Sequence, residues 1–447
     1  MATHTDEHLP AYDTTLMFSD KIGTNGMPAE DMPRLTKELE GVHKTLIDDW
    51  RTGKASFFEL PDAADDVRAS LRAAKTIAQK AKTLIVAGIG GSDLGSRALI
   101  DALGTKGKGM EVRFIGANTD PEEIATLIAS VDLKKCALNV ISKSGDTIEP
   151  MSAFLILRKE MLHVMSPEKF RERVVITTGT KGALHDIAQK EGYLELTVPE
   201  SVGGRFSALT PVGLFPAVCR GIPIQRLLNG SKEMRDAFVD SSNNALATPL
   251  LFAGLHVEAA LRRNQSIDVL MPYSEALRSF AFWYRQLWAE SLGKAQSRKG
   301  EKVYRGLTPI AALGATDQHS QLQLYNEGPV DKIVTFIEIE TFRKDFRIPS
   351  AFKGTHAAER LGGVRMSDII HTEREATART LASHGRPSGT LTIKKITPES
   401  VGALMMFFMI ATAAAAELLD VNAYDQPGVE EGKQFIGKSL DSKKLQK

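Results

Sequence analysis

Short runs of β-branched and apolar residues recur along the chain from residue 82, each followed by a glycine- and serine-rich loop and then by a helical pattern. The runs at 83–87 (TLIVA), 137–141 (ALNVI) and 173–178 (RVVITT) predict three buried strands. Strands that alternate with helices form parallel sheets from βαβ units. The pattern therefore predicts a doubly wound α/β domain, whose ligands bind at the carboxyl ends of the strands.

The same pattern begins again near residue 266. A run at 266–271 (SIDVLM), a helical segment at 276–293 and a long strand at 332–340 predict a second α/β domain, and residues 389–396 are expected to add one more strand. The predicted fold class is α/β, with two doubly wound parallel-sheet αβα sandwich domains. Helical N- and C-terminal extensions are expected to flank them.

Changes in composition place the boundaries of these domains. The first sixty residues mix a polar helical pattern with glycine and proline, and the chain beyond Gly432 is polar and rich in lysine. We predict a four-part chain with an N-terminal extension at 1–60, the first α/β domain at 61–230, the second at 231–420 and a C-terminal segment at 421–447.

An uncharged stretch of sixteen residues, 401–416, is the only one that could be taken for a membrane span. A bilayer needs about twenty apolar residues, so this stretch is too short to cross comfortably. The preceding Thr397-Pro398-Glu399-Ser400 has the character of a helix start. We predict a helix buried between layers of the protein.

Bulk composition excludes several classes of function. The 447 residues are 43% hydrophobic and 25% charged, and 56 basic against 55 acidic residues give a formal charge of +1. Such a balance gives no reason to expect nucleic acid or an anionic membrane as a partner. Cys136 and Cys219 are too few for a disulfide framework or a cysteine-based zinc site, and the N-terminus lacks the pattern of a secretory signal. We expect a cytoplasmic protein.

The loop GIGGSDLG, residues 88–95, follows the first predicted strand and opens a helix. Its glycines, among them Gly91, let backbone N–H groups approach a sugar or an anion, and Ser92 adds a hydroxyl. The spacing matches neither the dinucleotide fingerprint nor the P-loop, which argues against both kinds of nucleotide binding. The alternative is a tight turn that needs glycine for its geometry alone.

The loop SKSGDT follows the second predicted strand and also opens a helix. Ser142, Ser144 and Thr147 supply three hydroxyls beside the helix N-terminal amides, which together can bind a phosphate without a metal. Lys143 lies within the loop, although its side chain can face elsewhere. The alternative interpretation is an ordinary helix cap by Ser144 or Thr147.

Four further residues have the chemistry of proton transfer and charge stabilisation. Arg205 follows two glycines and suits a developing negative oxygen, because its guanidinium does not deprotonate. Glu290 ends an aromatic-rich helical segment, where a carboxylate partly shielded from water suits a general base. His319 titrates near neutrality, and Lys433 can hold a sugar oxygen or share in proton transfer. Taken singly, each is as well explained by a structural or surface role.

These residues lie in segments that resemble one known family. VGGRFSALTPVG and LLDVNAYDQPGVEEGK closely resemble the two signature motifs of glucose-6-phosphate isomerases, also called phosphoglucose isomerases, and GIGGSDLG, SKSGDT, QLWAESLGK and DQHSQ follow in the family's order. The resemblance extends over roughly residues 60 to 435.

The resemblance implies two sugar-isomerase (SIS-type) domains, a homodimer, and reversible conversion of glucose 6-phosphate to fructose 6-phosphate without a cofactor or metal. It implies that Ser142, Ser144 and Thr147 hold the phosphate, Arg205 faces the enediolate and Glu290 is the base. His319, reaching in from the neighbouring subunit, and Lys433 are implied in ring opening. The remaining implied ligand contacts are Gly91, Ser92, Lys143, Gln286 and Gln426.

Asp146 departs from the pattern, since many relatives carry a hydroxyl residue at its place in the phosphate loop. A carboxylate there repels a phosphate unless it points away or caps the following helix, and we expect it to cap the helix. Two other functions stay open at this point. One is a sugar-phosphate-sensing module, which does not need Glu290, His319 and Lys433 together. The other is a sugar kinase, which the missing P-loop disfavours.

Overall fold

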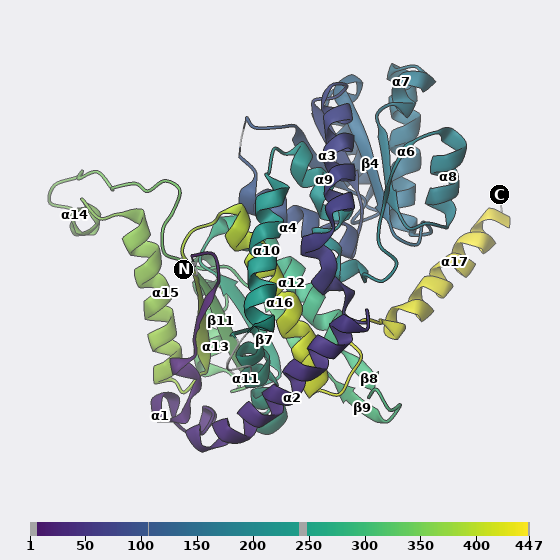
Figure 1. The fold of residues 1–447 in the computed structure, drawn as a ribbon. Coiled ribbons are helices and arrows are strands. Elements are labelled where there is room, and N and C mark those ends of the chain that lie inside the picture. The colour runs from purple at the N-terminus through teal and green to yellow at the C-terminus, as the bar shows by residue number, and fades with distance from the viewer. Residues whose placement is uncertain (1–6, 106, 241–247, 446–447) are drawn as a thin grey trace, which may run out of the picture.

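The computed structural model describes residues 7–105, 107–240 and 248–445, and two five-stranded sheets organise it (Figure 1). The first has the order β3-β2-β4-β5-β6, with every neighbouring pair parallel. Its strands are β2 (Thr83–Ala87), β3 (Glu111–Ile115), β4 (Cys136–Ser142), β5 (Val174–Thr178) and β6 (Leu194–Thr197). The three strands predicted here are confirmed. The edge strands β3 and β6 are additions that the sequence pattern does not predict.

Helices cover both faces of this sheet. Successive side chains of a strand point to opposite faces, so a strand that is apolar at every position presents an apolar surface on each face. In β2, Leu84 and Val86 belong to an apolar cluster on one face, and Ile85 and Ala87 to a separate cluster on the other. The covering helices are α3 (Ala64–Ala78) and α9 (Pro211–Cys219) on the first face, and α5 (Pro121–Ser130), α6 (Ile148–Val164) and α8 (Ala183–Glu191) on the second. The predicted αβα sandwich is confirmed.

The second sheet has the order β1-β12-β11-β7-β10. Its strands are β1 (Ala11–Asp13), β7 (Ile267–Pro272), β10 (Thr308–Ala311), β11 (Lys332–Ile339) and β12 (Ser388–Ile393). Four of them are parallel, whereas β1 pairs with β12 in the antiparallel sense. The N-terminal segment, expected only as a helical extension, therefore also supplies an edge strand to this sheet. Three residues are too few to show a strand periodicity in the sequence.

This sheet is also covered on both faces. Leu270, Ile337 and Leu391 pack into the largest apolar cluster, and Met271 and Phe336 lie in a cluster on the opposite face. The covering helices are α11 (Thr248–Arg263), α12 (Arg278–Leu292) and α16 (Pro398–Leu418) on the first face, and α13 (Leu322–Glu327) and α15 (Met366–Ser383) on the other. The second predicted sandwich is thus present as well.

The uncharged stretch 401–416 is the inner part of α16. Thr397 and Ser400 form a reciprocal capping box at its start, in agreement with the predicted helix start. By length and composition α16 could cross a membrane, but 89% of its most apolar window is buried inside the protein. It packs against α10 (Ile224–Val239) so closely that a Cβ at Gly402 would lie 1.9 Å from the carbonyl oxygen of Leu227. The predicted buried helix is confirmed.

Two helices in the C-terminal part of the chain lie away from the two sheets and the helices that cover them. In Figure 1, α14 (His356–Leu361) lies at the end of an extended loop, and α17 (Glu430–Leu445) projects from the opposite side of the protein. The other elements are α1 (Ser19–Ile22), α2 (Met32–Arg51), α4 (Leu94–Leu103), α7 (Pro167–Arg171), and the antiparallel pair β8 (Lys294–Gln296) and β9 (Lys302–Arg305). Short 3₁₀ helices connect many of these elements, including η5 (Gly90–Ser92), η7 (Gly204–Leu209) and η10 (Thr316–Gln318).

Candidate active site

The glycine-rich loop between β2 and α4 lies directly against two other predicted site segments. A Cβ at Gly91 would lie 2.2 Å from the carbonyl carbon of Gly204, so only glycine permits this approach to the segment that carries Arg205. Gly90 has a φ of +58°, and a Cβ there would lie 2.9 Å from Nε2 of Gln286. Gly91 is therefore required by close packing at the site, and Gly90 by its positive φ. Ser92 lies in the same loop and is half-buried.

An ion pair between a buried aspartate and a half-buried arginine lies at the start of the helix after this loop. Asp93 is 2% exposed, and its two oxygens accept hydrogen bonds from Arg97 at 2.9 and 3.1 Å. Burial raises the pKa of Asp93, and the Arg97 charge opposes that shift. The ion pair thus holds the C-terminal end of the loop against the first turn of α4.

The second predicted loop connects β4 to α6. The hydroxyls of Ser142 and Thr147 lie 2.8 Å apart, and the Ser142 hydroxyl also accepts from the backbone N–H of Gly145 at 3.2 Å. Gly145 has a φ of +78°, a conformation that favours glycine. Ser144 is exposed, and its hydroxyl accepts from the backbone N–H of the next residue but one at 3.4 Å. The loop thus places three hydroxyls at the N-terminus of α6.

The expectation for Asp146 is wrong in one respect. The N-cap of α6 is Thr147, which makes no side-chain capping hydrogen bond, and the Asp146 side chain is exposed. The Asp146 side chain is therefore exposed and not buried beside the hydroxyls, but it does not cap the helix as we expected.

Lys143 links this loop to the neighbouring one. Its ammonium donates hydrogen bonds to the carbonyl oxygens of Glu200 and Val202 at 2.7 and 2.9 Å. Burial lowers the pKa of Lys143. The amine thus holds the segment that leads to Arg205, and a direct contact with substrate stays a prediction.

Arg205 is the centre of the site. It is 2% exposed, and its guanidinium donates to five acceptors. They are Ser291 Oγ at 2.8 Å, Glu290 Oε2 at 3.3 Å, Gln426 Oε1 at 2.9 Å, and the carbonyl oxygens of Ala423 at 2.6 Å and Asp425 at 2.9 Å. Burial lowers the pKa of Arg205, while the charges of Glu290 and Asp425 act in the opposite direction. An arginine remains cationic under these conditions.

Glu290 lies in the last turn of α12, one turn after Gln286. Gln286 Nε2 donates to Glu290 Oε1 at 3.0 Å, so the two carboxylate oxygens are held by Gln286 and Arg205. The side chain is 34% exposed. The predicted partial shielding from water is confirmed, and the carboxylate keeps an open side.

The sequence-predicted residues Gly91, Arg205, Gln286, Glu290 and Gln426 thus meet at one place, although they come from four distant segments. Two further residues, Ser291 and Lys294, contact this cluster without having been predicted from the sequence. Both lie within the quoted segment QLWAESLGK, and Lys294 follows Glu290 by four residues, the spacing of one helical turn.

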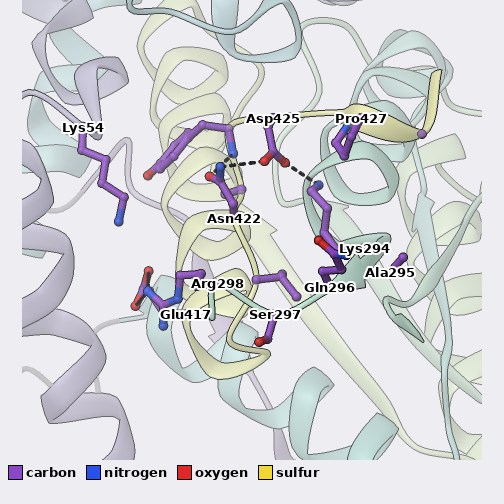
Figure 2. Close-up of a pocket in the computed structure, with 14 residues that line it drawn as sticks. Lys54, Lys294, Ala295, Gln296, Ser297, Arg298, Glu417, Asn422, Asp425 and Pro427 are labelled. Atoms are coloured by element: carbon purple, nitrogen blue, oxygen red, sulfur yellow. Dashed lines mark hydrogen bonds and ion pairs between the residues drawn. The ribbon is translucent and has the colours of Figure 1, made fainter. Parts of the chain in front are cut away.

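A cavity of about 620 Å³ lies beside this cluster (Figure 2). Its wall is formed by β8 and by the segment after α16, including Lys294, Ala423 and Asp425. Because Ala423 and Asp425 also bind Arg205 through their carbonyl oxygens, the cavity adjoins the site. Glu290 is not among its lining residues.

The structure does not bring His319 and Lys433 to this cluster. His319 is exposed at the end of η10, beside the second sheet. Lys433 is in the projecting α17, 64% exposed, with its ammonium 2.7 Å from Glu430. Their predicted roles stay predictions.

Within the described parts of the chain, no group of three or more His, Cys, Asp or Glu side chains is placed to hold a metal ion.

Comparison with known sequences agrees with the motifs. A family model for phosphoglucose isomerase matches residues 59–446. A glucose-6-phosphate isomerase from Carboxydothermus hydrogenoformans is 40% identical over 393 residues, which cover 86% of this chain and 84% of the relative. A glucose-6-phosphate isomerase from Rubrobacter xylanophilus is 35% identical over 418 residues, covering 92% and 94%.

Solved structures give the same result for the fold. A hypothetical protein from Thermus thermophilus superposes with a TM-score of 0.86 at 32% identity, covering 97% of this chain and all of the other. A glucose-6-phosphate isomerase from Chlamydia trachomatis superposes with a TM-score of 0.80 at 22% identity, covering 98% and 94%. Because the family model matches most of the chain and these relatives are 35–40% identical over most of both chains, the chain belongs to the phosphoglucose isomerase family.

Proposed function

We propose that this protein interconverts glucose 6-phosphate and fructose 6-phosphate in the cytoplasm, as a step of glycolysis and gluconeogenesis. The observation that supports the proposal most strongly is the ion pair between the partly exposed Glu290 carboxylate and the buried Arg205 guanidinium, with Glu290 Oε2 and Arg205 Nη1 3.3 Å apart. A proton carrier and a permanent cation side by side are what aldose–ketose isomerisation requires.

The reaction moves one proton between neighbouring carbons. In the open-chain aldose, Glu290 removes the proton from C2, and the electrons shift to give a cis-enediolate. The Arg205 guanidinium stabilises the negative oxygen of this intermediate. Glu290 then returns the proton at C1, while the hydroxyl proton moves from O2 to O1, which gives the ketose. Base, cation and an open chain suffice for this chemistry, so the proposal includes no cofactor and no metal.

The hydroxyl loop supports the proposal from the substrate's other end. Ser142, Ser144 and Thr147 sit at the N-terminus of α6, where helix amides favour a phosphate. We assign Gly91, Ser92, Lys143, Gln286 and Gln426 to further contacts with the sugar phosphate or with the loops that hold it.

Removing two of these hydroxyls is expected to weaken binding more than catalysis. In the Ser144→Ala/Thr147→Val double variant, KM for glucose 6-phosphate should rise about 10²- to 10⁴-fold, since each of the two lost hydrogen bonds to a charged group contributes about 1.5–3 kcal/mol. The value of kcat should change less than about threefold, because the phosphate is bound equally in ground and transition states. Steady-state kinetics measure both. Ser166→Ala, at the start of the distant α7, is the control, and an unchanged KM in the double variant contradicts the assignment.

Ring opening needs a separate acid or base, and we assign it to His319 and Lys433. Because His319 is exposed and apart from its own chain's Glu290 cluster, we propose a homodimer in which each site receives His319 from the other subunit. Lys433 acts from α17, the helix after the Gln426 segment.

Mixing two inactive variants tests this arrangement. Glu290→Gln and His319→Ala homodimers should each have little activity, whereas random reassociation gives half heterodimers, each with one complete site. About a quarter of wild-type activity should return. Verified heterodimers without recovery contradict a shared site, as does a fully active His319→Ala homodimer.

A coupled assay separates this function from the two rivals. Purified protein should convert fructose 6-phosphate to glucose 6-phosphate without ATP, and a chelator should leave the rate unchanged. A sensing module gives binding without turnover, and a sugar kinase requires ATP and Mg²⁺. Absence of turnover in well-folded protein overturns the proposal.

A further inference from the structure

Lys294 is almost completely buried at the end of the helix that carries Glu290. Its side chain is 6% exposed, and its ammonium donates to the carbonyl oxygens of Glu290 at 2.6 Å and Ser291 at 3.0 Å. It also lies 3.7 Å from Asp425 Oδ1, the ion pair drawn in Figure 2. One buried ammonium thus contacts two carbonyl oxygens and one carboxylate.

The two carbonyls belong to the last turn of α12. Carbonyl groups there lack partners within the helix and carry partial negative charge, so a cation stabilises them. Because Glu290 itself belongs to this turn, fixing its carbonyl restricts the backbone from which the carboxylate projects. Lys294 therefore acts on the orientation of Glu290 through the main chain.

The third contact of Lys294, with Asp425, also involves Arg205. The Asp425 carboxylate forms an ion pair with Lys294, and the Asp425 carbonyl oxygen accepts a hydrogen bond from Arg205. Ser291 is held in the same two ways, with its carbonyl bound by Lys294 and its hydroxyl by Arg205. Each partner of Lys294 is thus also bound to Arg205.

We propose that Lys294 is a positioning residue, which holds the end of α12 and the 423–426 segment together so that Glu290 and Arg205 act on the same two substrate carbons. The proposal rests on the role of Glu290 proposed above. Lys294 touches the proton carrier only through the backbone, so its loss should misalign proton transfer without removing the base.

An ammonium is an unfavourable group to bury for stability alone. Burial, together with the nearby charge of Arg205, lowers the pKa of Lys294 to about 8. Well-packed apolar residues often stabilise a protein as well as or better than a buried ion pair. The presence of a lysine here is better explained by a requirement for geometry than for stability.

Lys294→Met keeps the length of the side chain and removes every donor. We expect kcat for glucose 6-phosphate to fall about 10- to 100-fold, the cost of a small misplacement of reacting groups. KM should change less than about threefold, because the phosphate loop is untouched. The isotope effect on kcat with substrate deuterated at C2 should increase, since proton transfer becomes more strongly rate-limiting.

Lys332→Met is the matched control. Lys332 is also a buried lysine next to an aspartate and a backbone carbonyl, at the start of β11. Its loss should lower the melting temperature without changing the isotope effect. Lys294→Arg, which keeps the charge and the donors, should recover part of kcat and bring the isotope effect back toward the wild-type value.

The outcomes are separable. If Lys294→Met has wild-type kcat and isotope effect per folded molecule, the positioning role is wrong, whatever happens to stability. If Lys294→Met does not fold, the same measurement on Lys294→Arg and Lys294→Gln decides, with wild-type kcat in the Gln variant overturning the proposal. An active Glu290→Gln enzyme in the same assays instead disproves the underlying role of Glu290.

Discussion

Replacing Glu290 with glutamine should lower kcat for glucose 6-phosphate by about 10²- to 10⁴-fold, the contribution of a positioned proton-transfer group. Glutamine has nearly the same shape, and its oxygen can still accept the hydrogen bond from Arg205. Folding should therefore be preserved, while the group that removes the proton is absent. Steady-state kinetics with a coupled assay, and thermal unfolding, measure the two effects.

Glu38→Gln is the control, because Glu38 also pairs with an arginine but lies on the surface of α2. It should have wild-type kinetics. A well-folded Glu290→Gln enzyme with near-normal turnover excludes Glu290 as the base. Among the described residues, Glu290 is the one whose side-chain carboxylate accepts a hydrogen bond from Arg205, so no second candidate base is paired with this arginine.

Replacing Arg205 with lysine should lower both activity and stability. Lysine has three donors for the five acceptors that now surround the guanidinium, so at least two lose their partner. We expect kcat to fall about 10²- to 10³-fold, the usual effect of removing one group that stabilises a developing oxyanion. The free energy of unfolding should fall by about 2–4 kcal/mol, because buried acceptors are left unpaired.

Kinetics and urea unfolding of Arg205→Lys test both parts. Arg226→Lys, in a partly exposed ion pair with Glu399, is the control and should change kcat little. A variant that loses stability but retains kcat assigns Arg205 a structural role only.

Much of the fold could be predicted because its central strands are short, apolar and followed by glycine-rich loops. The runs at 83–87 and 137–141 are buried on both faces, and such runs are readily seen in a sequence. The edge strands β3 and β6 are partly exposed and mix charged with apolar residues, so their pattern is weak. β1 depends on pairing with β12, nearly 380 residues later, which no local pattern contains.

The candidate site was predictable in its residue types but not in its connections. Arg205 and Glu290 are 85 positions apart, and only the packing of the loop after β2 against η7 and α12 brings them together. Lys294 was missed because lysines are seldom buried, so the prior for a surface role is strong. His319 and Lys433 are exposed and lie apart from the Glu290 cluster, so the roles predicted for them stay predictions.

A structure with a bound six-carbon sugar phosphate in its open-chain form would test the proposed proton transfer. The mechanism requires a Glu290 oxygen within about 3.5 Å of both C1 and C2, the distance over which a proton can be transferred. It also predicts the Arg205 guanidinium beside the C1 or C2 oxygen and the phosphate on Ser142, Ser144 and Thr147. A sugar whose C1 and C2 lie away from Glu290, with another side chain at that distance, would contradict it.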